Sequence, residues 1–164
     1  MNILNRSVVG GLMAALVLLS TGASLAATVV NVTLFDNGAA MTMATGLAYA
    51  SPPPDLSAAT MGIKALPATA KAGVVTFKVT NTSTDTIHEM LVIALADPTK
   101  PLPYVAADSR VDEEAAGDKG EVSELDPGAS GSLTLSLAPG HYLLICNVAG
   151  HFSAGMWTTF EVTK

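Results

Sequence analysis

The feature that most constrains the fold of this chain is the stretch from Cys146 to Met156. It contains the only cysteine in the protein, which is followed by His151 after four residues and by Met156 after four more. Thiolate, imidazole and thioether groups are the soft and borderline ligands that suit copper. Three ligands from one loop leave a type 1 copper ion one ligand short, so the fold must bring a distant side chain to this loop.

Two further histidines, His88 and His141, are candidates for the missing ligand. Residues 141–146 are expected to form a strand, in which successive side chains point to opposite faces. Cys146 then shares a face with Tyr142, whereas His141 points the other way and is expected to be a partly exposed residue at the strand end. His88 follows a polar turn, opens an apolar strand and lies far from the loop in sequence. The predicted metal ligands are therefore His88, Cys146, His151 and Met156.

Short alternating segments rich in β-branched residues make up much of the remaining sequence and indicate strands. In the clearest of them, Val75, Phe77 and Val79 share one face. Residues 39–59 and 97–118 are expected to be long irregular connections, the second with one helical turn. We expect an all-β sandwich of about eight strands, at residues 28–35, 61–66, 74–80, 87–95, 120–125, 132–137, 141–146 and 157–162.

Residues 1–27 have the features of a secretory signal peptide. Arg6 precedes the uncharged apolar run 8–19, and small residues lead to a cleavage position after Ala26 or Ala27. The run is shorter than the roughly 20 apolar residues that a membrane-spanning helix needs. We therefore expect a cleaved leader, one domain over residues 28–164, a periplasmic or otherwise extracytoplasmic location and no stable membrane insertion. An uncleaved anchor is the alternative.

The expected mature domain is acidic. Removing Arg6 from the eight basic residues leaves seven against fourteen acidic ones, a net charge near −7, which argues against nucleic acid as a partner. An acidic stretch within this domain forms either a solvated loop or a docking patch for a basic redox partner such as a cytochrome. Its acidic residues are Asp108, Asp112, Glu113, Glu114, Asp118, Glu121 and Glu124. The sequence lacks a Ser-His-Asp set, a phosphate loop and paired catalytic carboxylates, so we do not expect an enzyme.

The residues around Cys146 carry a resemblance to a known family. The run Pro139-Gly140-His141-Tyr142-Leu143-Leu144-Ile145-Cys146 matches a Pro-Gly-x-Tyr-x-x-x-Cys pattern, and the loop ends in Gly150-His151 and Gly155-Met156. In these features the chain resembles the cupredoxins, the small blue copper proteins. The spacing Cys-x4-His-x4-Met is most similar to that of rusticyanin and sulfocyanin, whereas plastocyanin and azurin have shorter loops. The resemblance covers most of residues 60–164 and is weaker over 28–60.

The resemblance implies a Greek-key β-sandwich that holds one type 1 copper ion. It also implies one-electron transfer, in which the copper alternates between Cu(II) and Cu(I) while the protein carries electrons between extracytoplasmic cytochrome-like or oxidase-like partners. We expect a monomer. His151, on the outer loop, is then the expected exit for the electron. Its expected rim of small or apolar neighbours comprises Val148, Ala149, Gly150, Phe152 and Ala154.

Other interpretations stay open at this point. Many cupredoxins have an asparagine after the first histidine that pins the copper loop, but this chain has Glu89 there. Whether Glu89, Asn147 or a backbone group replaces the pinning hydrogen bond is open at this point. Met41 and Met43 are either core residues or a second Cu(I) site. The Met-rich segment 41–61 also suggests a periplasmic copper carrier or storage protein. Cys146 could be a buried structural thiol, and zinc is disfavoured because its structural sites usually lack methionine.

Overall fold

The computed structural model describes residues 27–38 and 42–164. The signal-peptide interpretation of residues 1–27 and the metal-site hypothesis for Met41 therefore lie outside the described residues, apart from Ala27. Within the described part no helix is both long and apolar enough to span a bilayer. The described elements are β1 (Thr28–Asp36), η1 (Leu56–Ala58), β2 (Met61–Leu66), β3 (Thr69–Lys71), β4 (Gly73–Asn81), β5 (His88–Ala94), β6 (Tyr104–Val105), β7 (Arg110–Val111), α1 (Glu113–Ala116), β8 (Asp118–Leu125), β9 (Ser130–Leu137), β10 (Gly140–Ile145) and β11 (Trp157–Thr163).

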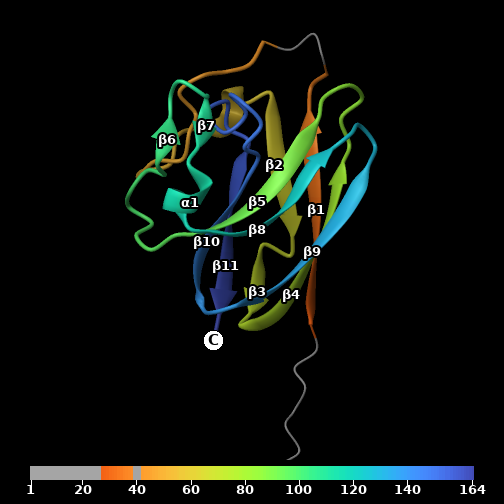
Figure 1. Cartoon of the computed structure of the whole chain (residues 1–164), viewed down its shortest axis with the longest axis vertical. Helices are drawn as coiled ribbons and strands as arrows, with labels where there is room; N and C mark the ends of the chain where they lie inside the picture. The colour runs from red at the N-terminus through yellow and green to blue at the C-terminus, as the bar shows by residue number, and fades with distance from the viewer. Residues whose placement is uncertain (1–26, 39–41) are drawn as a thin grey trace, which may run out of the picture.

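Two sheets form the sandwich that the sequence predicted (Figure 1). One has the strand order β2-β1-β4-β9 and the other β3-β11-β10-β5-β8. Pairing is antiparallel except between β1 and β4 and between β11 and β3. All eight expected strands are present. The short strands β3, β6 and β7 were not predicted, because two or three residues are too few to show alternation.

The core between the sheets follows the alternation of the strands. Val75, Phe77 and Val79 of β4 are fully buried, and the Phe77 ring packs edge-on against Phe160 of β11 with centroids 5.3 Å apart. On β10, Tyr142 points into the same core. Burying these side chains is the main source of stability for such a frame.

A second apolar cluster lies on the other side of β10. Leu143 and Ile145, which alternate with the core residues, pack there with Trp157 of β11. The irregular segment 42–59 covers this side, because the Trp157 Nε1 donates to the Leu47 carbonyl oxygen at 2.7 Å and the Tyr49 ring packs edge-on against Trp157. Both faces of β10 are therefore buried, and the strand is held firmly where it leads into Cys146.

Candidate metal centre

His88, Cys146 and His151 converge in the structure. His88 begins β5, Cys146 follows the last residue of β10, and His151 lies in the loop between β10 and β11. One ligand atom from each side chain lies within 4.8 Å of the other two, and all three residues are buried. The Cys146 Sγ is 3.3 Å from the His151 Nδ1 and 4.0 Å from the His88 Nδ1. These distances leave the three groups close enough to share one small ion.

Met156, the fourth predicted ligand, is tied to the same loop through its backbone. Its N–H donates to the His151 carbonyl oxygen at 3.0 Å, and its own carbonyl oxygen accepts from the Cys146 N–H at 3.0 Å. The Met156 side chain is fully buried and belongs to the core cluster that contains Cys146. The loop therefore closes on itself with Met156 beside Cys146, while the role of all four residues as ligands remains a prediction.

Two glycines allow this loop to turn and to pack closely. Gly150 and Gly155 have φ angles of +85° and +96°, in the region that glycine adopts at no steric cost. A Cβ at Gly155 would lie only 3.1 Å from the Ala59 Cβ, and one at Gly150 only 3.2 Å from the Met43 Cε. The Gly-His and Gly-Met pairs thus let the segment 42–59 lie directly on the loop.

Asn147 takes the pinning role that the sequence left open. Its Oδ1 accepts from the Val111 N–H at 2.7 Å, and its Nδ2 donates to the Val111 carbonyl oxygen at 3.0 Å and to the Glu113 Oε1 at 2.8 Å. These bonds tie the loop to β7 and α1. Glu89 contributes through its backbone instead, because its N–H donates to the Cys146 Sγ at 3.5 Å.

The Glu89 side chain is buried beside this centre. It is 4% exposed, and its Oε1 lacks a hydrogen-bond partner, although the Arg110 Nη1 lies 3.9 Å away. Burial, reinforced by the nearby Glu121 carboxylate, raises the pKa of Glu89 to about 7. The negative charge of Glu89 is therefore only partly formed near neutral pH in the metal-free protein.

Near neutral pH, burial favours the uncharged forms of the three clustered side chains in the metal-free protein. Burial lowers the pKa of His151 to about 4, with the neighbouring His88 adding to the effect. Burial also lowers the pKa of His88 and raises that of the Cys146 thiol to about 12. Neutral imidazoles are ready to bind a metal, and a bound cation displaces the proton of a thiol. Two imidazoles, one potential thiolate and a buried thioether nearby fit copper better than zinc.

Sequence reasoning missed Asp36, the last residue of β1. Its Oδ2 lies 2.9 Å from the His88 Nε2, and the Asp36 side chain is 1% exposed. Burial opposes ionisation of this carboxyl, but hydrogen bonds from the Gly38 N–H and from the Ser83, Thr86 and His88 side chains outweigh it and lower the pKa of Asp36. The sequence Asp36-Asn37-Gly38 indicated only a turn, so no local signal could have revealed this contact.

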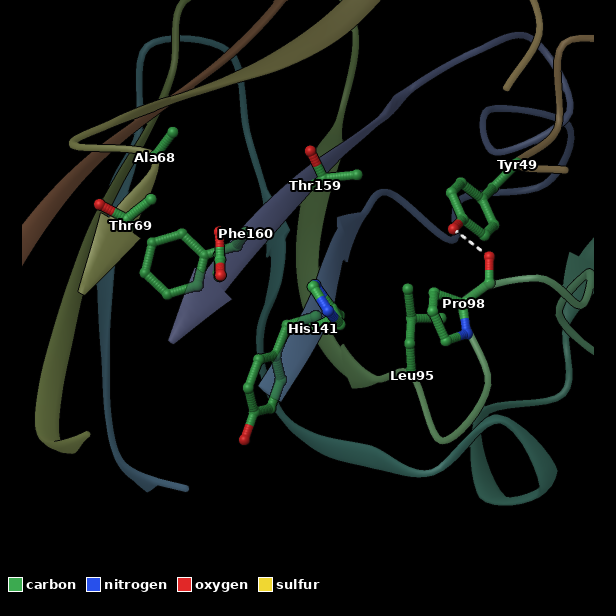
Figure 2. A pocket seen from close by; sticks show the side chains of 10 residues that line it. Tyr49, Ala68, Thr69, Leu95, Pro98, His141, Thr159 and Phe160 are labelled. Atoms are coloured by element: carbon green, nitrogen blue, oxygen red, sulfur yellow. Dashed lines mark hydrogen bonds between the residues drawn. The ribbon is translucent and has the colours of Figure 1, made fainter. Parts of the chain in front are cut away.

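His141 lies outside the cluster, as the alternation of β10 predicted. It is exposed and lines a hollow of about 330 Å³ together with Tyr49, Pro98 and Thr159. Figure 2 shows this hollow, where the Tyr49 hydroxyl donates to the Pro98 carbonyl oxygen at 2.6 Å. The hollow therefore belongs to the packing of the irregular segments on β10 and β11, not to the metal centre.

The expected rim of exposed small and apolar residues around His151 is wrong in part. Phe152 is only 2% exposed and Ala154 is fully buried, because the turns after His151 fold them under the loop. The Phe152 ring packs near that of Tyr104, with centroids 6.2 Å apart. Ala149 is exposed, and of the residues named for the rim it is the most accessible.

The chain matches the model of the Sulfocyanin (SoxE) domain over residues 51–164. Rusticyanin from Thiobacillus ferrooxidans has a similar structure, with a TM-score of 0.51 and 16% identity over 82% of this chain and 76% of rusticyanin. Auracyanin from Roseiflexus castenholzii gives a TM-score of 0.48 and 18% identity over 84% of this chain and 97% of auracyanin. None of the curated proteins matches the chain. At this identity the likeness to rusticyanin shows a shared β-sandwich fold.

Proposed function

Because this chain belongs to the sulfocyanin family of cupredoxin blue copper proteins, we propose that it carries single electrons through one type 1 copper ion. Members of this family are electron carriers and not enzymes. The observation that carries the proposal is the buried meeting of His88, Cys146 and His151, with their ligand atoms within 4.8 Å of one another. The resemblance of residues 1–27 to a signal peptide supports a location outside the cytoplasm, where the protein would transfer electrons between redox partners.

Each side chain has a distinct part in this proposal. His88, Cys146, His151 and Met156 would hold the ion through two imidazoles, a thiolate and a thioether. Copper bound there supplies a one-electron couple and an intense thiolate charge-transfer absorption. The hydrogen bonds of Asn147 and of the Met156 backbone fix the loop in one conformation. A ligand set held this firmly has little freedom to rearrange between oxidation states, which favours fast electron transfer.

The visible spectrum of the copper-loaded protein tests this function. We expect an intense absorption band that a mild reductant bleaches and that an oxidant restores, because Cys146 is the chain's only thiolate donor. A copper carrier or storage protein would instead bind mainly Cu(I), exchange it readily and show no stable Cu(II) colour. If the protein took up no copper and stayed colourless, it would share only the fold of its family and would not transfer electrons through copper.

The acidic stretch 108–124 supports a basic redox partner, although several of its members also make hydrogen bonds within the chain. Asp112 caps α1 by accepting from the Ala115 N–H at 3.0 Å, and Glu113 accepts from Asn147. Asp108, Glu114, Glu121 and Glu124 are exposed and make up the acidic patch that we propose for docking.

We expect electron transfer to a basic c-type cytochrome to slow as salt is added. The Debye length falls from about 30 Å at 0.01 M to about 8 Å at 0.15 M ionic strength, so steering by the acidic patch fades. Stopped-flow rates over this range measure the effect, and Glu121→Gln with Glu124→Gln should flatten the salt dependence. The matched change Glu161→Gln, at an exposed position on β11, should not. Salt-independent rates in the unchanged protein would rule out the acidic patch as the docking surface.

A further inference from the structure

Asp36 is placed to control the predicted ligand His88. It ends β1, which belongs to one sheet of the sandwich, whereas His88 begins β5 in the other sheet. The 2.9 Å contact between the Asp36 Oδ2 and the His88 Nε2 therefore bridges the two sheets beneath the metal centre. Both side chains are almost completely buried, so water and salt screen the contact much less than they would at the surface.

The surroundings of Asp36 are built to hold a carboxylate in one orientation. Its Oδ1 accepts from the Gly38 N–H at 2.8 Å, which leaves the Oδ2 free to face His88. The Ser83 and Thr86 side chains also help to hold the pKa of Asp36 below its ordinary value. Asn81 fixes the turn that contains Ser83 and Thr86. The Asn81 Oδ1 accepts from the Ser83 N–H at 3.0 Å, and its Nδ2 donates to the Thr86 carbonyl oxygen at 2.8 Å.

The contact with Asp36 favours one nitrogen of His88 as the metal-binding atom. An ionised carboxylate only accepts hydrogen bonds, and a neutral imidazole has one N–H and one free lone pair. With the proton on Nε2 and directed at Asp36, the lone pair is on Nδ1. That atom is the one facing the centre, 3.3 Å from the His151 Nδ1 and 4.0 Å from the Cys146 Sγ.

We propose that Asp36 is a positioning residue that holds His88 as the Nε2–H tautomer and biases the centre toward oxidised copper. A carboxylate that accepts the far N–H of a ligating histidine makes that ligand more basic. A buried negative charge also favours the more positive of two oxidation states, because the interaction is weakly screened. Only the effect on the copper oxidation state rests on the proposed copper function, whereas the effect on the His88 tautomer does not.

The test combines a measurement on the metal-free protein with one on the copper protein. In ¹⁵N NMR spectra of the metal-free protein, His88 should show a protonated Nε2 and an unprotonated Nδ1. In Asp36→Asn, the amide can donate to Nε2, so Nδ1–H should become populated. In copper-loaded Asp36→Asn, the ratio of Cu(II) to Cu(I) affinity should fall at least tenfold, which raises the potential of a one-electron couple by about 59 mV.

Two variants separate this role from loss of charge or of sheet contacts in general. Asp97→Asn removes a carboxylate whose side chain is 44% exposed. Thr82→Val removes the hydrogen bond from the Thr82 Oγ1 to the Leu34 carbonyl oxygen, another link between β1 and this turn. Both should leave the His88 tautomer and the copper potential unchanged. Asp36→Glu keeps the carboxylate, so its tautomer and its potential should lie between those of the unchanged protein and those of Asp36→Asn.

Either of two results would overturn the inference. One is a proton on the His88 Nδ1 in the unchanged metal-free protein. The other is a potential in Asp36→Asn that moves no more than in the two control variants, with only the melting temperature lowered, which would make Asp36 a purely structural link. A chain that takes up no copper would refute the proposed function, while the NMR measurement would still decide the role of Asp36.

Discussion

Replacing Cys146 with serine should abolish the visible absorption of the copper-loaded protein. It should also weaken copper binding by more than about 100-fold, because replacing residues that only support the ligands typically weakens binding by about 10- to 100-fold. Serine keeps the size of the side chain but stays protonated, so it provides neither a thiolate bond nor the charge transfer that gives the colour. Absorption spectra and copper titrations measure both losses. The melting temperature of the metal-free variant should change little, because a small neutral side chain still fills the site.

Met156→Leu is the matched comparison for this experiment. Leucine preserves the volume and apolar character of the buried side chain but removes the thioether. The colour should remain, because Cys146 is unchanged, and the reduction potential should rise, because a weaker axial interaction favours Cu(I). Equal loss of colour in the two variants would show that Met156 is more than a weak axial ligand.

Much of the fold could be predicted because its strands alternate. The pattern in β4 put Phe77 on one face with Val75 and Val79, and the structure shows that this face is buried. The pattern in β10 put Tyr142 and His141 on opposite faces, and the structure confirms this, with Tyr142 buried and His141 exposed. Alternation could not show that Leu143 and Ile145 are equally buried. Their cover comes from the segment 42–59, which is irregular apart from the single turn η1 and is held by side-chain contacts such as that of Trp157 with Leu47.

The sequence predicted the candidate ligands in the loop but not the residues that hydrogen bond to them. The local spacing of Cys146, His151 and Met156 indicated that they are candidate ligands, and strand alternation was enough to choose His88 over His141. Asp36 reaches His88 across the two sheets, a contact without any periodic signal in the sequence. The depth of Phe152 and Ala154 was misjudged for a related reason, because turns do not alternate and their side chains are placed by packing alone.

Asn147→Ala should destabilise the metal-free protein by about 3 kcal/mol, since buried backbone groups left without partners each cost about 1–3 kcal/mol. Asn147 is 1% exposed and satisfies both the N–H and the carbonyl oxygen of the buried Val111. Alanine leaves both without a protein partner, and it frees the start of the copper loop from β7. Chemical denaturation of the metal-free protein measures the loss of unfolding free energy.

Two controls show whether the Val111 bonds cause this effect. Glu113→Ala removes only the third bond of Asn147, at an exposed position, and should cost less than about 1.5 kcal/mol. Asn31→Ala makes the same change of side chain on the exposed side of β1 and should stay within about 0.5 kcal/mol. If Asn147→Ala cost no more than Glu113→Ala, the loop would be held mainly by the segment 42–59 and by its own turns, and Asn147 would not be its pin.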